Sequence, residues 1–108
     1  MNYFIVTVLL AAKLLTLQSA LNDMAKQEGV DPVLAACIVA HESNWDTDLV
    51  SEAGDTGLFQ IIPSTAEWVA TKMNLQGYDL HDPETNMRMG LWILKRYPKW
   101  YTTLRYCD

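Results

Sequence analysis

The chain has 108 residues, which is enough for one domain. Half of its residues are hydrophobic, and its formal charge is −5. An acidic domain has no electrostatic reason to bind nucleic acid or an anionic membrane surface, so the composition argues against nucleic-acid binding. His41 and His81 stand apart in the sequence without partners, and no pattern of histidine and cysteine predicts a metal site or a cofactor.

The first unit of the chain, residues 1–20, is strongly apolar. Tyr3–Ala12 is a run of ten uncharged residues, and Lys13 follows it. Ten apolar residues are short for a bilayer span but fit the core of a signal peptide, with small residues just before position 21. The lack of a preceding Lys or Arg, and Lys13 itself, favour the alternative of an N-terminal helix packed on the domain. We expect residues 1–20 to be an export signal, cleaved or uncleaved. If it is not cleaved, residues 3–17 would tether the protein to a membrane.

Cap signals predict four helices from residue 17 onward. An Asp-Pro pair opens the second and the fourth, a Ser-Thr-Ala-Glu capping box opens the third, and Gly29 ends the first. The predicted helices are Leu17–Gln27, Pro32–Ser43, 64 to 73 or 75, and Pro83–Arg96. Trp45–Gly57 is expected as a loop and Leu58–Ile62 as a short strand or extended segment. The chain from 21 to 108 is thus a small, mainly α domain with one loop-rich cleft.

The second predicted helix is hydrophobic nearly all round, which is typical of a central helix. Leu34, Cys37, Ile38 and His41 are expected to form its buried stripe. Glu42 lies near its C-terminus, where the helix dipole disfavours an anion. A glutamate on an apolar helix beside a glycine-containing loop suits general acid catalysis, because burial raises its pKa.

Cysteine usage leaves two interpretations open. Cys37 lies among apolar residues, where a reduced cysteine is usually a small core side chain. A Cys37–Cys107 disulfide is the alternative if the protein is exported.

Several spaced segments lie in one colinear order over roughly residues 20–97. They are Glu28-Gly29-Val30-Asp31-Pro32, Glu42-Ser43 with Trp45, Ser51, Gly54-x-x-Gly57-Leu58-Phe59-Gln60-Ile61-Ile62-Pro63-Ser64-Thr65-Ala66, and Asp82-Pro83-Glu84-Thr85-Asn86. Together they resemble the lytic transglycosylase family, the SLT-type enzymes related to goose-type lysozyme. The resemblance implies a lysozyme-like (α+β) fold and cleavage of the β-1,4 bond between N-acetylmuramic acid and N-acetylglucosamine in peptidoglycan, giving 1,6-anhydromuramic ends. It also implies a periplasmic or extracellular protein, or one associated with a phage virion.

By this resemblance Glu42 is the catalytic acid and base. Ser51 and Gln60 match cleft positions that hydrogen-bond near the catalytic glutamate and the sugar, Ile62 matches an apolar position at the site, and Gly57 belongs to the loop that lies against the ligand. Trp45, Trp68, Trp92 and Trp100 are candidates for stacking on sugars, although aromatic residues at helical spacing more often belong to the core. Asp46, Asp48 and Asp55 have the pattern of solvated turn residues, any of which could instead orient a water molecule.

The chain departs from the family in one respect. The family carries Ala-Tyr-Asn-Ala-Gly downstream of the Asp-Pro-Glu helix, and its tyrosine reaches the catalytic glutamate. No such motif precedes Asp108, and Tyr101 and Tyr106 lack its context, so the family's C-terminal part is expected to be missing. Three alternatives therefore accompany the transglycosylase: a hydrolytic muramidase of the same fold, a non-catalytic peptidoglycan-binding remnant, and a small membrane protein anchored by residues 1–17.

Overall fold

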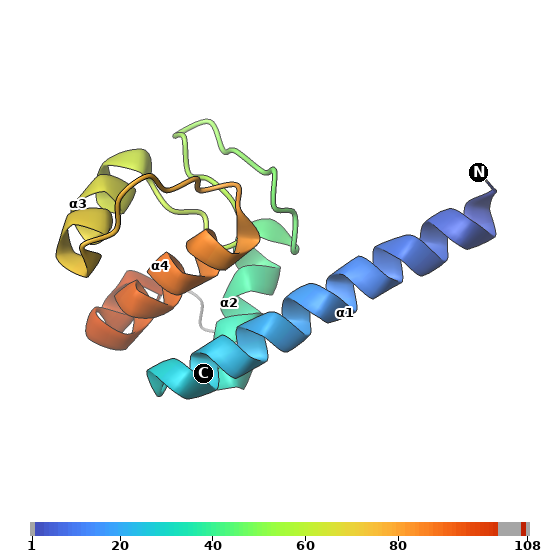
Figure 1. Cartoon of the computed structure of the whole chain (residues 1–108), viewed down its shortest axis with the longest axis horizontal. Coiled ribbons are helices and arrows are strands. Elements are labelled where there is room, and N and C mark those ends of the chain that lie inside the picture. Colours follow the sequence, from blue (N-terminus) through green and yellow to red (C-terminus); the bar gives the residue numbers. More distant parts are fainter. Residues whose placement is uncertain (1, 102–106, 108) are drawn as a thin grey trace.

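The computed structural model describes residues 2–101 and residue 107 of the chain. Its described part is mainly helical, as the sequence predicts, and contains isolated β-bridges but no named strand. The elements in order are α1 (Tyr3–Glu28), α2 (Pro32–Ser43), α3 (Pro63–Met73), α4 (Pro83–Arg96) and a 3-10 helix, η1 (Pro98–Tyr101). In Figure 1, α2 and α4 lie beside the C-terminal half of α1, and α3 lies on the far side of α4.

The helix boundaries follow most of the predicted caps. Asp31 accepts a hydrogen bond from the Val33 N–H at the start of α2, and Asp82 accepts one from the Thr85 N–H at the start of α4. Gly29 ends α1 in the left-handed conformation (φ 79°), which glycine adopts without strain. The predicted capping box of α3 is wrong. Pro63 occupies the first helical position, so Ile62 is the N-cap and contributes no side-chain hydrogen bond.

The core gathers around α2, whose buried face differs from the predicted stripe. Ala35, Ile38 and Val39 are buried, whereas His41 is exposed. The predicted stripe is rotated from the observed buried face by about one residue, or roughly 100° around the helix. The correct face continues from Val39 to the partly buried Glu42, so the core-facing side of α2 leads directly to that carboxyl group.

The segment between α2 and α3 is an irregular loop closed by isolated antiparallel bridges. Thr56 pairs with both Val50 and Ile61. The strand or extended segment predicted from Leu58 is wrong. These residues form a tight turn, and Gln60 has a φ of 50°. Leu58 and Phe59 are fully buried in that turn, so their apolar character reflects burial and not strand formation.

The predicted helix from Leu17 is the C-terminal part of a longer helix. α1 is continuous from Tyr3 to Glu28, and its first half extends away from the other helices in Figure 1. Leu17, Leu21 and Ala25 are buried, whereas Tyr3, Leu9 and most residues before Leu17 are exposed. By length and composition alone, α1 is apolar enough to cross a membrane.

A disulfide joins α2 to the C-terminal segment. Cys37 and Cys107 are bonded across 70 positions of sequence, with their Cα atoms 5.6 Å apart. The bond resolves the two alternatives that the sequence leaves open for Cys37 in favour of pairing. It also places Cys107 beside the helix that carries Glu42.

Candidate active site

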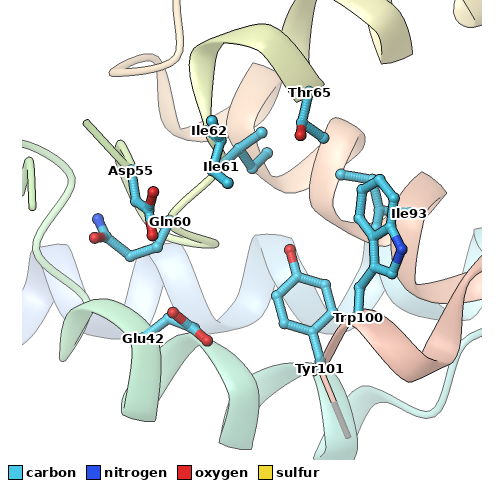
Figure 2. Close-up of a pocket in the computed structure, with 9 residues that line it drawn as sticks. All are labelled: Glu42, Asp55, Gln60, Ile61, Ile62, Thr65, Ile93, Trp100 and Tyr101. Atoms are coloured by element: carbon cyan, nitrogen blue, oxygen red, sulfur yellow. The ribbon is translucent and has the colours of Figure 1, made fainter. Parts of the chain in front are cut away.

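A cleft of about 410 Å³ opens at the C-terminal end of α2. In Figure 2, Glu42 and Tyr101 rise from one side, the loop before α3 faces them, and Trp100 closes one end. The lining residues are Glu42, Asp55, Gln60, Ile61, Ile62, Thr65, Ile93, Trp100 and Tyr101.

Glu42 is the penultimate residue of α2, and its carboxyl group is partly buried in this cleft. Burial raises its pKa, the negative charge of Asp55 raises it further, and the neighbouring His41 acts in the opposite direction. Each effect that raises the pKa disfavours the carboxylate, so the side chain keeps its proton to higher pH than an ordinary glutamate. A protonated carboxyl in an open cleft can donate that proton to a bound ligand.

The sequence pattern predicts that Asp55 is a solvated turn residue, but Asp55 lines the cleft. It is partly buried, and its Oδ1 is buried without a hydrogen-bond partner among the described residues. That first interpretation is therefore wrong. The sequence does contain a signal for Asp55 as a lining residue, because Asp55 belongs to the glycine-containing loop that is expected to face a ligand.

Ser51 and Gly57 are not among the residues that line the cleft. Ser51 instead supports Asp55: its N–H donates to the Asp55 carbonyl (2.9 Å) and its Oγ accepts from the Asp55 N–H (3.0 Å). Gly57 has a φ of 77°, and a Cβ there would lie 2.6 Å from the Leu80 carbonyl oxygen. The structure therefore gives Gly57 a role in close packing, because any larger residue would displace the backbone.

Gln60 and Ile62 do line the cleft. The Gln60 side-chain amide donates to the carbonyls of Gly57 (2.9 Å) and Leu49 (3.1 Å), which holds the turn in place. Ile62 is 47% exposed, so it presents apolar surface to whatever occupies the cleft. The proposed roles of these residues in binding stay predictions.

Asn86, in the first turn of α4, fastens the loop to the helical core. It is buried, its Oδ1 accepts from the Phe59 N–H (2.8 Å), and its Nδ2 donates to the carbonyls of Thr56 (2.9 Å) and Leu80 (2.8 Å). Three backbone groups, two of them buried, thus bond to one side chain, and the Thr56 carbonyl also accepts from the Ile61 N–H. The asparagine of the Asp-Pro-Glu-Thr-Asn motif therefore positions the loop that carries Asp55 and Gln60.

The opposite wall of the cleft comes from η1. The Tyr101 hydroxyl donates a weak hydrogen bond to the Phe59 carbonyl (3.4 Å). Burial and the charges of Glu42 and Asp55 raise the pKa of Tyr101, which keeps the phenol protonated. Trp100 is 49% exposed and stacks on Tyr97 at 5.4 Å between ring centroids. Tyr101 thus lies in the same cleft as Glu42, although the sequence assigns it no role, while Tyr106 lies outside the described residues.

The other tryptophans divide between core and surface. Trp45 and Trp92 are partly buried against the core, whereas Trp68 is 38% exposed and contacts Trp92, Tyr97 and Trp100. Among the four tryptophans, Trp100 is the one that lines the cleft.

His41 does not stand apart from the cysteines as the sequence suggested. Donor atoms of Cys37, His41 and Cys107 lie within 4.8 Å of one another. Metals bind the thiolate form of cysteine, and both sulfurs here are joined in the disulfide. The group is therefore a disulfide beside a histidine. The absence of a metal site and of a cofactor stays a prediction from the sequence.

The profile of the transglycosylase SLT domain matches residues 19–107. The chain belongs to this family. The soluble lytic murein transglycosylase of Escherichia coli K12 is 34% identical over 79 residues, which cover 66% of this chain and 12% of that protein. The endo-type membrane-bound lytic murein transglycosylase A of Klebsiella pneumoniae is 40% identical over 67 residues, covering 57% of this chain and 33% of that protein.

Solved structures agree with the assignment. The 70 kDa soluble lytic transglycosylase of Escherichia coli superposes with a TM-score of 0.65 at 28% identity, over 76% of this chain and 14% of the enzyme. An inactive mutant of the lytic transglycosylase Slt from Pseudomonas aeruginosa gives a TM-score of 0.69 at 26% identity, over 78% of this chain and 14% of that one. The chain thus spans a small fraction of these relatives and has the lytic transglycosylase fold predicted from its motifs.

Proposed function

We propose that this SLT domain cleaves the β-1,4 bond between N-acetylmuramic acid and N-acetylglucosamine in peptidoglycan and forms 1,6-anhydromuramic ends. The observation that carries the proposal is the partly buried carboxyl of Glu42, whose pKa is raised in an open cleft at the end of α2. A general acid is helped by a raised pKa and needs a path to the substrate; burial and Asp55 raise the pKa of Glu42, and its carboxyl group lines an open cleft.

In the proposed reaction Glu42 acts twice. It first donates its proton to the glycosidic oxygen, and the bond from that oxygen to C1 of the muramic residue breaks. The substrate's acetamido oxygen stabilises the positive charge that develops at C1. The Glu42 carboxylate then accepts the proton of the C6 hydroxyl, whose oxygen bonds to C1. No water is consumed, and the carboxyl group is restored.

The walls of the cleft support the binding of a sugar chain. Gln60 supplies an amide on one side, and Ile62 supplies apolar surface next to it. Trp100 exposes an indole face at one end, where the apolar face of a sugar ring can stack. Ser51 and Gly57 contribute indirectly, by fixing the loop on which these groups lie.

The pattern of burial supports a domain that begins near residue 21. Among residues 2–20, all are exposed apart from Leu17 and Ala20, so removal of an export signal there would cost the core little. We accordingly propose a domain over residues 21–108 that acts outside the cytoplasm on peptidoglycan, in a bacterium or as part of a phage virion. An uncleaved α1 would instead tether it to a membrane through residues 3–17.

A hydrolytic muramidase is the second candidate, and Asp55 is the observation that favours it, because a second carboxylate in the cleft can orient a water molecule. Mass spectrometry of the soluble products from purified peptidoglycan separates the two. Anhydro-muropeptides would support the transglycosylase, and muropeptides with reducing ends would support the hydrolase. A folded protein that binds peptidoglycan but releases no product would contradict both.

A further inference from the structure

We propose that Asp55 is the second carboxylate of the active site, facing Glu42 across the cleft and stabilising the positive charge that develops on the sugar as the glycosidic bond breaks. The inference rests on the proposed glycosidic cleavage and adds a residue that the sequence motifs did not assign. It applies to both products, since transglycosylation and hydrolysis share an oxocarbenium-like transition state.

The position of Asp55 is the first support. It lines the same cleft as Glu42, and Figure 2 shows its carboxylate on the wall opposite that residue, pointing toward the space between them. Glu42 comes from a helix and Asp55 from the loop before α3. A sugar ring bound between two such walls would have the acid on one side and a negative charge on another.

The loop fixes the backbone from which this carboxylate projects. Two hydrogen bonds with Ser51 fix the Asp55 backbone on both its N–H and its carbonyl. The next residue, Thr56, forms bridges to Val50 and Ile61, and its Oγ1 donates to the Gly54 carbonyl (2.8 Å). Preorganisation of this kind is what electrostatic stabilisation of a transition state requires, because the charge need not reorient during the reaction.

The charge of Asp55 is uncompensated in the free protein. Its Oδ1 is buried without a hydrogen-bond partner, and Asp55 has no ion-pair partner within residues 2–101. A buried, unsatisfied carboxylate oxygen is costly for folding, and such costs concentrate at functional sites. A cationic sugar transition state in the cleft that Asp55 lines would be attracted by this charge. The same charge helps to hold the proton on Glu42, so the acid and the stabilising anion reinforce each other.

The test is Asp55→Asn, which keeps the shape of the side chain and removes its charge. The matched control is Glu52→Gln, which removes one charge from an exposed position in the same loop. We expect kcat on purified peptidoglycan to fall about 100-fold in Asp55→Asn with KM changed less than about threefold. The alkaline limb of its pH profile should move to lower pH, because Glu42 loses the neighbour that raises its pKa. Glu52→Gln should change none of these quantities.

Two results would overturn the assignment. One is an Asp55→Asn protein with kcat within twofold of wild type. The other is a loss of activity with an unmoved pH profile and a lower melting temperature, which would make Asp55 a structural residue. If the wild-type protein itself releases no product, the proposed function fails. The Glu42 pKa, measured by carboxyl ¹³C NMR in wild type and Asp55→Asn, then tests separately whether Asp55 acts on Glu42 across the cleft. An unchanged Glu42 pKa would refute this coupling between the two carboxyl groups.

Discussion

The two walls of the cleft are built in different ways. The wall that carries Asp55 and Gln60 is a loop fastened by backbone bridges and by the buried Asn86 side chain. The wall that carries Trp100 and Tyr101 is held by aromatic packing, one weak hydrogen bond and a disulfide through Cys107. The first wall is fixed mainly by hydrogen bonds, some within the loop and others from Asn86 of α4. The second is held mainly by the packing of aromatic rings and by one covalent bond.

Breaking the hydrogen-bonded wall should have the largest effect. Asn86→Ala leaves the buried Phe59 N–H and the partly buried Leu80 carbonyl without their hydrogen-bond partner and removes one of the two bonds to the Thr56 carbonyl, and we expect the free energy of unfolding to fall by about 4 kcal/mol. Chemical denaturation measures the change. Glu84→Ala, at an exposed position in the same turn, should change it by less than about 0.5 kcal/mol. An Asn86→Ala protein as stable as this control would show that the loop does not depend on Asn86.

Release of the aromatic wall should have the second-largest effect on stability. Reduction of the Cys37–Cys107 disulfide removes the constraint on a 70-residue loop, for which we expect a loss of about 3 kcal/mol and reduced peptidoglycan cleavage. Thermal unfolding with and without reductant measures it, and the double variant Cys37→Ser with Cys107→Ser should no longer respond to reductant. Equal melting temperatures of the wild-type protein with and without reductant would show that the disulfide does not stabilise the fold.

Within the aromatic wall, Trp100 tests sugar binding. Trp100→Ala should raise KM for glycan strands about tenfold, equivalent to about 1.4 kcal/mol, with little change in kcat, because the exposed indole supplies binding surface and not a proton. Trp100→Phe, which keeps a ring, should recover most of the affinity. Steady-state kinetics on soluble glycan fragments provide both constants. An unchanged KM in Trp100→Ala would remove Trp100 from the binding surface.

The smallest effect should be a gain of stability at Glu42. Its pKa is raised in the folded protein, so the folded state binds more protons than the unfolded chain between the ordinary pKa and the raised one. Stability of the wild type therefore falls as pH rises through that window. Glu42→Gln should be more stable than wild type at pH 7, by less than about 1 kcal/mol because the group is partly exposed. The difference should vanish below the ordinary glutamate pKa of about 4.3. Equal melting temperatures at pH 7 would contradict the raised pKa.

The helices could be predicted because their start and end signals are local. Asp31, Asp82 and Gly29 act within a few residues of their own positions, and the structure places them as expected. The turn at Leu58–Gln60 could not, because two buried apolar residues have the same local pattern in a turn as in a strand. The side chain that fastens this turn, Asn86, lies 27 positions beyond Phe59.

The residues of the site divide in the same way between those whose place follows from a local motif and those whose place depends on the tertiary fold. The positions of Glu42 and Gln60 in the cleft follow from a motif that resembles a known family, whereas their chemical roles stay predictions. The burial of Asp55 depends on the tertiary fold of its loop, which charge and spacing do not encode. Tyr101 reaches the cleft as the last residue of η1, and the disulfide at Cys107 joins residues 70 positions apart, a pairing that the sequence left open.

The central claim is that Glu42 supplies the proton for glycosidic cleavage. The direct measurement is the release of soluble muropeptides from purified peptidoglycan by wild type, Glu42→Gln and the exposed control Glu67→Gln. The amide keeps the shape of Glu42 but cannot donate the proton, so we expect a loss of at least about 10³-fold with the fold intact by circular dichroism. Glu67→Gln should match wild type. Full activity in Glu42→Gln would show that the acid lies elsewhere.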